Sequence, residues 1–253
     1  MADSLVIIPT YNEKGNIVRI IDAIFSLSQA FHILIVDDGS PDGTAELVQQ
    51  QKERYPGRLF LIERAGKLGL GTAYITGFKW GLQRGYDYLF EMDADFSHNP
   101  KDLPRLRAAC AEEEADLAIG SRYIRGGKLE NWPFDRIVLS YGASLYVKFI
   151  TWMPVNDPTA GFICYHRRVL SAIDLDKIRF VGYAFQIEMK FAAYQLGFKL
   201  REVPITFTDR IEGISKMSKG IVKEAIWGVL QMRLRGFFST YALESGVEWE
   251  QPQ

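Results

Sequence analysis

Short apolar runs alternate with longer amphipathic segments through the first half of the chain. The runs have the length of buried strands and lie at residues 5–8, 33–36, 59–62, 88–92 and 117–120. The segments between them are predicted helices and lie at residues 15–28, 44–55, 72–84 and 100–114. This alternation predicts an α/β fold in which a mostly parallel sheet is covered by helices on both faces.

The second half of the chain is less regular. Helices are predicted at residues 136–151 and 185–196, and strands at residues 161–165 and 200–203. A last helix is predicted at 220–238, where an apolar side is surrounded by lysines, arginines and aromatic residues. This pattern fits either an interfacial amphipathic helix or a helix docked on the core. We therefore expect a single domain over residues 1–240, followed by a loose polar tail at 241–253.

The composition limits the classes of function that the chain can have. Among 253 residues, 30 Lys and Arg stand against 31 Asp and Glu, for a net charge of −1. Nothing in the overall charge favours nucleic acid as a partner. The two cysteines, Cys110 and Cys164, are far apart in sequence. This spacing argues against a disulfide framework and favours the reduced cytoplasm.

Neither end of the chain predicts a membrane-spanning segment. The N-terminus enters its first apolar run without a basic region or a long apolar stretch, and no run approaches about 20 apolar residues. We therefore expect no signal peptide and no transmembrane helix. Contact with a membrane would have to be peripheral, at its cytosolic face, or pass through a membrane-protein partner.

Two of the predicted strands are followed by paired carboxylates. Asp37 and Asp38 follow the second strand, and Asp93 and Asp95 follow the fourth. Open α/β sheets bind ligands at the carboxyl ends of their strands, and carboxylates beside a diphosphate suit a hard divalent cation. The sequence therefore predicts a site for a phosphorylated ligand and Mg²⁺ or Mn²⁺, with Asp93 and Asp95 as metal ligands; plain polar turns are the alternative. His98 is expected to support this site, because the neighbouring oxygen donors favour a hard ion.

Aromatic, acidic and basic residues follow the other strands of the first half. Tyr11 and Glu13 come after the first strand, where no glycine-rich phosphate loop is present. A ring and a carboxylate there suit a nucleoside, and an ordinary strand-to-helix turn explains them equally well. Asp38 is expected to contact the same nucleoside. Lys67 opens the third helix, whose N-terminus can receive an anion, with a solvated lysine as the alternative.

Basic residues are spread through the second half of the chain near predicted strand or helix ends. Arginine binds phosphate through a forked pair of N–H groups. Each of these side chains by itself would be an ordinary solvated cation. As a set they predict a second phosphate site, formed by Arg122, Arg136, Arg210 and Lys216.

Several segments together resemble the family 2 glycosyltransferases with a GT-A fold, and more narrowly their branch of dolichyl-phosphate (polyprenyl-phosphate) mannosyltransferases. The first are Pro-Thr-Tyr-Asn-Glu at 9–13, Val-Asp-Asp-Gly-Ser-Pro-Asp-Gly-Thr at 36–44 and Met-Asp-Ala-Asp-Phe-Ser-His at 92–98. The later ones are Gly-Ser-Arg-Tyr at 120–123, Gly-Tyr-Ala-Phe-Gln-Ile-Glu-Met at 182–189, and Val-Pro-Ile at 203–205 leading to Asp209-Arg210 and Ser215-Lys216. These later segments are the more specific to the branch.

The resemblance implies a GT-A-like (Rossmann-like) fold with residues 1–121 as the nucleotide-sugar half and 122–240 as the acceptor half. It implies that guanosine is held by Pro9, Tyr11, Glu13, Val36 and Asp38. It further implies that the ribose and diphosphate face Asp93, Ala94 and Asp95, with Asp95 as the firmest metal ligand. Ser97 stands where relatives often carry Gln, and its contact with a metal is left open.

The resemblance also implies an acceptor site and an activity. Arg122, Arg210 and Lys216 would bind phosphates, and Arg136 and Ser140 would bind the lipid phosphate. The implied reaction transfers mannose from GDP-mannose to a polyprenyl or dolichyl monophosphate, with Asp95, Arg122 and Arg136 as catalytic residues. We expect the fold to survive Arg122→Ala and Arg136→Ala while turnover is lost.

A phosphate acceptor is chemically reasonable for such a site. Its second pKa is about 6, so near neutral pH it needs no strong general base. The first alternative is a transferase of the same fold that uses UDP-glucose or a hydroxyl acceptor, for which Glu188 is the candidate base. A sugar nucleotidyltransferase would need a glycine-rich loop after the first strand. A non-catalytic nucleotide-sugar binding module is the remaining alternative.

Overall fold

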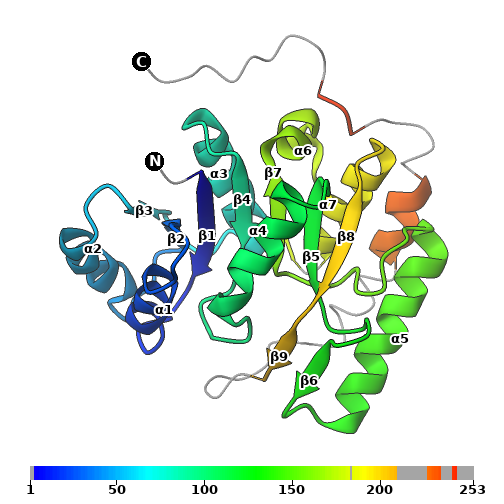
Figure 1. The fold of residues 1–253 in the computed structure, drawn as a ribbon, viewed down its shortest axis with the longest axis horizontal. Coiled ribbons are helices and arrows are strands. Elements are labelled where there is room, and N and C mark those ends of the chain that lie inside the picture. Colours follow the sequence, from blue (N-terminus) through cyan, green and yellow to red (C-terminus); the bar gives the residue numbers. More distant parts are fainter. Residues whose placement is uncertain (1–2, 183, 210–226, 235–240, 244–253) are drawn as a thin grey trace.

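The computed structural model describes residues 3–182, 184–209, 227–234 and 241–243. Its central strands are β1 (Ser4–Thr10), β2 (His32–Asp37), β3 (Leu59–Glu63), β4 (Tyr88–Glu91), β5 (Leu117–Ser121), β7 (Ile163–His166) and β8 (Leu200–Pro204). They form one sheet in the order β3-β2-β1-β4-β7-β5-β8 (Figure 1). Neighbouring strands pair in parallel, except that β7 is antiparallel to β4 and β5. The predicted mostly parallel α/β sheet is thus confirmed.

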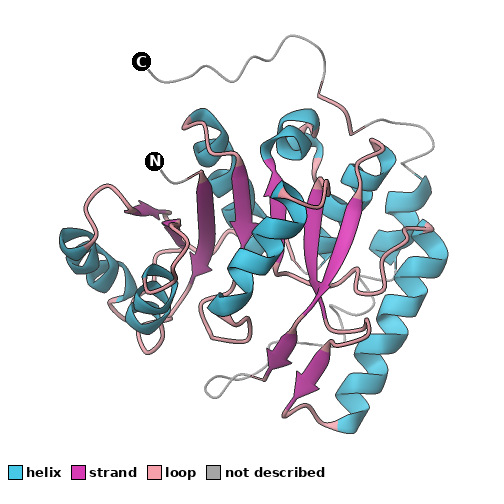
Figure 2. Ribbon diagram, viewed as in Figure 1, coloured by secondary structure: helices cyan, strands magenta, loops and turns pink. Residues whose placement is uncertain are grey.

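Alternating side chains of the strands build a core on each face of the sheet. Leu5 and Ile7 of β1 belong to the core on one face, and Val6 and Ile8 belong to the core on the other. The first core is covered by α3 (Leu70–Gln83), α6 (Arg167–Ala172) and α7 (Ala184–Gln195). The second core is covered by α1 (Ile17–Phe25), α2 (Thr44–Arg54) and α4 (Leu103–Ala111). Figure 2 shows these helices on both sides of the strands.

The α3 helix lies unusually close to the sheet because it carries glycines where it crosses the strands. A Cβ atom at Gly77 would come within 2.5 Å of the Ile7 side chain, and one at Gly81 within 2.6 Å of Leu89. Larger residues at these positions would push the helix outward. The glycines therefore allow α3 to pack directly on β1 and β4.

A second, smaller sheet lies at the lower edge of the molecule in Figure 1. It pairs β6 (Lys128–Glu130) in parallel with β9 (Thr206–Thr208). Neither strand was predicted, because three residues are too few to show an alternating pattern. The short helix α6 was not predicted either. This small sheet leads directly into α5 (Phe134–Thr151), which lies beyond β8.

Several predicted boundaries move when compared with the structure. The predicted helix at 100–114 begins as the 3₁₀ turn η1 (Pro100–Asp102) and ends as α4 at Ala111. Another 3₁₀ turn, η2 (Leu175–Lys177), follows α6. Of the last predicted helix, residues 227–234 are helical, and the rest of it lies outside the described residues, as does the tail from 244. In the described part of the chain, no helix is both long and apolar enough to cross a membrane.

Candidate active site

The carboxyl ends of β2, β1 and β4 meet at one edge of the sheet. Thr10 at the end of β1 pairs with Asp37 at the end of β2, and Ile7 pairs with Glu91 at the end of β4. The loops that carry Tyr11, Asp38 and the Asp93 segment therefore leave the sheet side by side. This arrangement brings together the predicted nucleoside and metal residues, as the parallel topology requires.

The two aspartates after β2 have different surroundings. Asp37 is fully buried and closes the turn, because its carboxylate accepts hydrogen bonds from Thr10 Oγ1 (2.8 Å), Ser40 N (2.8 Å) and Ser40 Oγ (2.6 Å). The oxygens of Asp37 are therefore used by the fold. Only Asp38 remains a candidate for contact with a ligand.

Asp38 forms a buried ion pair with Arg64, which the sequence pattern did not single out. Arg64 Nε donates to Asp38 Oδ1 at 2.6 Å. Its other nitrogens donate to Thr72 Oγ1 (2.8 Å) and to the Gly69 carbonyl (3.3 Å) at the start of α3. Arg64 therefore links the predicted nucleoside carboxylate to the loop that holds Lys67. Its place directly after β3, at the same edge of the sheet, was the available signal.

Tyr11 and Lys67 come together although they lie far apart in sequence. Lys67 Nζ lies 4.9 Å from the centre of the Tyr11 ring, a cation–π contact. Glu13 is tied to the start of α1, since Asn16 Nδ2 donates to its Oε2 at 3.1 Å.

The two remaining residues predicted to hold the nucleoside differ in exposure. Pro9 is half-buried at the end of β1, next to Val36 of β2 in the register. Val36 is fully buried in the core, so its side chain cannot reach a ligand. Any contact that Val36 makes falls to its backbone.

The Asp93–Asp95 segment is a tight loop with oxygen donors. Ser97 donates to Asp95 Oδ1 from its N–H (3.0 Å) and from its hydroxyl (2.6 Å), so this serine orients the aspartate. Asp93 N donates to His98 Nδ1 at 3.3 Å, and Phe96 has the left-handed φ of 61°. Backbone in this region is strained for a bulky residue and is held by its surroundings. The buried imidazole thus supports the loop, as the sequence predicted.

The donor chemistry of this loop fits a hard divalent cation. Asp93 and Asp95 are half-buried, and Ala94 between them is packed in the core. Within the described ranges, no cluster of three or more His, Cys, Asp or Glu side chains could bind a metal by itself. A cation here would therefore share its coordination sphere with phosphate oxygens and water, as Mg²⁺ commonly does.

A buried carboxylate, Glu91, lies at the end of β4, two residues before Asp93. Burial raises the pKa of Glu91 to about 7, and burial lowers the pKa of Lys190 to about 8. Tyr165 donates its hydroxyl to Glu91 Oε1 at 2.9 Å. Lys190 Nζ donates to the carbonyls of Ala160 (2.6 Å) and Gln186 (2.9 Å). Lys190 thereby joins α7 to the loop before β7, which contributes to the acceptor half.

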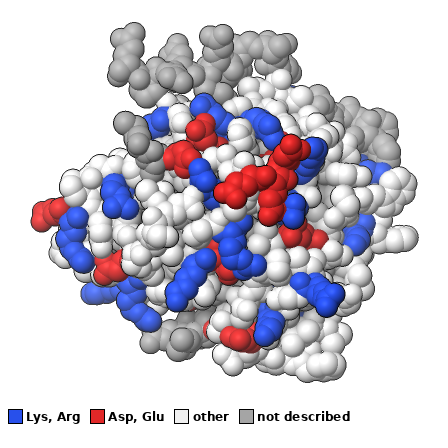
Figure 3. Space-filling view, viewed as in Figure 1, with Lys and Arg blue, Asp and Glu red and all other residues white. Residues whose placement is uncertain are grey.

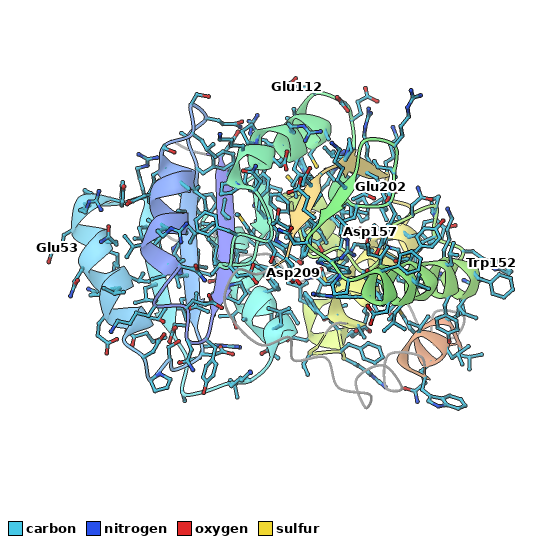
Figure 4. The ribbon with its side chains drawn as sticks, turned by 90° about the horizontal axis from the view of Figure 1, so that it is seen from below. Glu53, Glu112, Trp152, Asp157, Glu202 and Asp209 are labelled. Atoms are coloured by element: carbon cyan, nitrogen blue, oxygen red, sulfur yellow. The ribbon has the colours of Figure 1, made fainter. Side chains whose placement is uncertain are left out.

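Arg122 is held rigidly from that same loop. Asp157 is fully buried and accepts hydrogen bonds from Arg122 N (3.0 Å), Nε (2.7 Å) and Nη2 (2.6 Å). Glu202 of β8 in turn accepts from the Asp157 N–H at 2.9 Å. Burial alone would lower the pKa of Arg122, but the charge of Asp157 outweighs it and raises that pKa. Figure 4 shows Asp157 and Glu202 close together.

Arg136 and Ser140 lie on α5 near Arg122. Arg136 Nη1 donates to both carboxylate oxygens of Asp209, at 2.9 and 2.8 Å. Ser140 Oγ accepts from the hydroxyl of Tyr123, the residue after Arg122, at 2.8 Å. The structure thus brings together two of the predicted phosphate-binding arginines with Ser140. Arg210 and Lys216, the other predicted members of the set, lie outside the described residues.

Glu188, the candidate base for a hydroxyl acceptor, is part of the core. It is fully buried, and its carboxylate accepts from the N–H groups of Arg179 (2.8 Å) and Phe180 (3.0 Å) and from the Tyr241 hydroxyl (3.2 Å). These contacts fix the segment before α7. They also satisfy the carboxylate away from solvent, so Glu188 is not a suitable base.

The fold and this site define a sugar transferase of the GT-A type. The chain belongs to the family 2 glycosyltransferases: the family model described as "Glycosyl transferase family 2" matches residues 5–174. The protein is therefore a glycosyltransferase, as the sequence segments predicted.

Two curated relatives are similar over nearly their whole length. A polyprenol monophosphomannose synthase of Mycolicibacterium smegmatis is 48% identical over 233 residues, which cover 92% of this chain and 88% of the relative. An undecaprenyl-phosphate mannosyltransferase of Micrococcus luteus is 46% identical over 230 residues, covering 91% and 93%.

Solved structures share the fold at much lower identity. The mannosyltransferase PcManGT from Pyrobaculum calidifontis, solved with GDP-Man and Mn²⁺, has a TM-score of 0.60 and 17% identity, covering 95% of this chain and 66% of that one. The glucosyl-3-phosphoglycerate synthase of Mycobacterium tuberculosis, solved with Mn²⁺, UDP-Glc and phosphoglyceric acid, has a TM-score of 0.65 and 17% identity, covering 96% and 82%. This likeness confirms the GT-A-like fold.

Proposed function

We propose that this protein transfers mannose from GDP-mannose to a polyprenyl (dolichyl-type) monophosphate, with inversion at the anomeric carbon. The observation that carries the proposal is that the Asp93–Asp95 loop after β4 and Arg122 after β5 lie at the same edge of the sheet. Arg136 of α5 joins Arg122 there through the Trp132 ring. One group suits a cation on a diphosphate, and the other suits a second phosphate. The names of the two close relatives, which act on polyprenyl-type phosphates, support this choice of acceptor.

Residues 1–121 would bind the donor. The base would pack at Tyr11, with Lys67 beside it, and Asp38 would accept from the nucleoside because Arg64 holds its carboxylate in place. Asp93 and Asp95 would hold Mg²⁺ or Mn²⁺, which when bound would neutralise charge on the diphosphate. A solved mannosyltransferase of the same fold contains GDP-Man and Mn²⁺, which supports this assignment.

Residues 122–240 would bind the acceptor. Arg122 and Arg136 would hold the lipid phosphate, with Ser140 as an added donor, while Arg210 and Lys216 would bind phosphates of donor or acceptor. A phosphate oxygen attacks C1 of mannose as the bond from C1 to the GDP oxygen breaks, and the electron pair leaves with GDP. Because the acceptor is already ionised, the chain supplies position and positive charge rather than a base.

The α5 helix presents the surface that we propose for peripheral contact with a lipid bilayer. Large apolar side chains recur along one side of it and are exposed, among them Phe134, Val138, Tyr141, Leu145, Phe149 and Trp152. The side chains of Phe134 and Phe149 are 79% and 77% exposed, and Figure 3 shows few charged groups over this part of the surface.

The position and charge of this surface fit the cytosolic face of a membrane. Arg136 and Ser140 lie on the same helix, so a lipid phosphate bound there would have its chain beside the apolar side chains. Arg233 lies 4.5 Å from the centre of the Trp152 ring and adds a cation at the margin, where anionic headgroups would be. This helix is a candidate for the interfacial element in addition to the predicted last helix, most of which lies outside the described residues.

The transfer reaction tests the proposed function. Labelled mannose from GDP-mannose should enter the lipid phase when a short polyprenyl phosphate is supplied, and EDTA should stop it. Transfer from UDP-glucose instead would keep the fold and overturn the donor. Tight nucleotide-sugar binding without transfer from either donor would favour a hydroxyl acceptor or a binding module.

Vesicle sedimentation tests the surface of α5. Phe149→Glu should reduce binding to vesicles that contain anionic lipid, while transfer to a short, detergent-soluble acceptor is kept. Gln50→Glu on α2, an exposed position at the other end of the sheet, makes the same change in charge and should leave vesicle binding unchanged. Failure of the wild-type protein to bind vesicles would refute this surface and favour a membrane-protein partner.

A further inference from the structure

One tryptophan contacts both arginines of the acceptor half. The guanidinium carbon of Arg136 lies 3.9 Å from the centre of the Trp132 ring, and that of Arg122 lies 5.8 Å from it. Phe207 meets the indole edge-on, with ring centres 5.6 Å apart at 87°, and lies 5.4 Å from the Arg122 guanidinium. Trp132 stands between β6 and α5, and Phe207 belongs to β9, so the small sheet assembles this cluster.

Two like charges near one another need compensation in the absence of a ligand. Asp157 compensates Arg122, and Asp209 compensates Arg136. The indole face adds attraction for both guanidinium groups through its negative π-electron density, which is strongest for tryptophan among the aromatic residues. It also restricts the flexible Arg136 side chain, which is otherwise tied only to Asp209 among the contacts of the described residues.

We infer that Trp132 is a positioning residue that holds Arg122 and Arg136 together as one binding pair for the acceptor phosphate. This inference rests on the proposed function. Preorganising both arginines lowers the entropy that must be lost when the phosphate binds. The ring does not need to touch the ligand for this role, since it acts through the two guanidinium groups.

The same cluster also connects the arginine pair, through ring contacts, to the Asp93–Asp95 loop. Phe207 meets the His98 ring at 5.4 Å, and His98 stacks on Phe162 at 4.9 Å while its Nδ1 accepts from Asp93 N. A continuous set of ring contacts therefore runs from the Asp93 backbone to Trp132. Because rings pack with little freedom, the cluster sets how far the acceptor phosphate lies from the donor.

The environment of the indole nitrogen indicates that Trp132 acts through its ring face and not through its N–H group. Trp132 Nε1 is buried and has no hydrogen-bond partner among the described residues. A buried donor without a partner is unfavourable. If the position required only an apolar ring to fill space, phenylalanine, which has no N–H group, would avoid this cost. The role therefore predicts that Trp132→Phe, which keeps a ring face, retains function.

The chain offers a matched control for the arginine–tryptophan contact. On α3, the guanidinium carbon of Arg84 lies 3.9 Å from the centre of the Trp80 ring, the same distance as in the Arg136 contact. Trp80 packs against Phe60 and Tyr86, away from the candidate site. Trp80→Leu thus removes a similar contact without touching the proposed acceptor site.

The test compares Trp132→Leu, Trp132→Phe and Trp80→Leu in the mannose transfer assay and in equilibrium binding of a short polyprenyl phosphate. Trp132→Leu should raise the KM and Kd for the polyprenyl phosphate on the order of tenfold, equivalent to about 1.4 kcal/mol. The KM for GDP-mannose should change less than about twofold, within experimental error of an unaltered site. Trp132→Phe should recover most of the loss, and Trp80→Leu should behave as wild type.

Three outcomes would overturn the inference. It is wrong if Trp132→Leu binds polyprenyl phosphate as tightly as wild type, if Trp132→Phe is as impaired as Trp132→Leu, or if both substrates lose affinity equally. If Trp132→Leu does not fold, Trp132→Phe decides by itself, because its KM for the polyprenyl phosphate must stay close to that of the wild type. Absence of transfer by the wild-type protein would refute the proposed function, and the binding measurement would still test Trp132.

Discussion

Arg122 and Arg136 occupy equivalent places in the proposed reaction but different places in the fold, and alanine substitution should separate the two. The Arg122 side chain is 8% exposed and its partner Asp157 is fully buried. The Arg136 and Asp209 side chains are 31% and 28% exposed. Both substitutions should abolish transfer, since each removes a phosphate-binding cation. Only Arg122→Ala leaves a charged carboxylate without its counterion inside the protein.

The two substitutions should differ by several kcal/mol in how much they lower the free energy of unfolding. Removing one partner of a buried ion pair costs about 3–5 kcal/mol, whereas a partly exposed pair contributes about 0–1 kcal/mol. For a chain of this size, 1 kcal/mol corresponds to roughly 2–4 °C in Tm. Arg122→Ala should therefore lower Tm by about 6–20 °C, and Arg136→Ala by at most about 4 °C. This refines the expectation that the fold survives both substitutions, because the two variants should differ in stability.

The pH dependence of folding stability should also reflect the ion pair between Arg122 and Asp157. In the wild type, burial would raise the pKa of Asp157, but Arg122 outweighs burial and lowers it below the usual 3.8. The unfolded chain then binds more protons, so this stabilisation is present above about pH 4 and is lost as the pH falls further. Without Arg122, burial should raise that pKa instead, so protonation at low pH should relieve the penalty.

Urea unfolding of both variants from pH 7 down to pH 4.5 tests these expectations. The gap in unfolding free energy between Arg122→Ala and wild type should narrow as the pH falls. Adding Asp157→Asn to Arg122→Ala should restore part of the stability at pH 7 without restoring transfer. A free energy of unfolding for Arg122→Ala within about 1 kcal/mol of that for Arg136→Ala would refute the reasoning, because it would mean that Asp157 becomes solvated when Arg122 is removed.

Three further predictions concern the donor side and the buried lysine. Arg64→Met should raise the KM for GDP-mannose about tenfold with little change in kcat, because Asp38 loses the partner that holds it; an unchanged KM would contradict that role. Asp95→Asn should weaken the stimulation of transfer by Mn²⁺, measured by titrating the metal, and an unchanged titration would exclude Asp95 as a ligand. Lys190 has a folded pKa lowered by burial to about 8, so the unfolded chain binds more protons between that pH and 10.5. Wild-type stability should therefore rise with pH in this window relative to Lys190→Met, and parallel curves would contradict it.

The sequence by itself determined the order of strands and helices in the first half and the residues at the strand ends. Apolar runs separated by amphipathic segments predict strands that the structure places within a few residues of their expected bounds. Parallel strands bring their carboxyl ends to one edge, so Tyr11, Asp38, Asp93 and Asp95 could be grouped before any coordinates. Local pattern and topology suffice for such features, because each depends on a single strand and its following turn.

Only the tertiary structure decided which role each of these residues has. Asp37 and Asp38 are neighbours in sequence, yet one closes a turn and the other pairs with Arg64, because burial and partners come from other strands. The three-residue strands β6 and β9 are too short to be recognised, yet their pairing brings Trp132 and Asp209 to Arg136.

The assembly of the acceptor site is likewise a property of long-range contacts. Arg122 is paired with Asp157, which is fixed by Glu202 of another strand. The exposed side of α5 could not be recognised from its sequence, because its apolar residues are typical of a helix packed on a core. Whether an apolar side chain is buried depends on what packs against it, and that is decided only when the whole chain is folded.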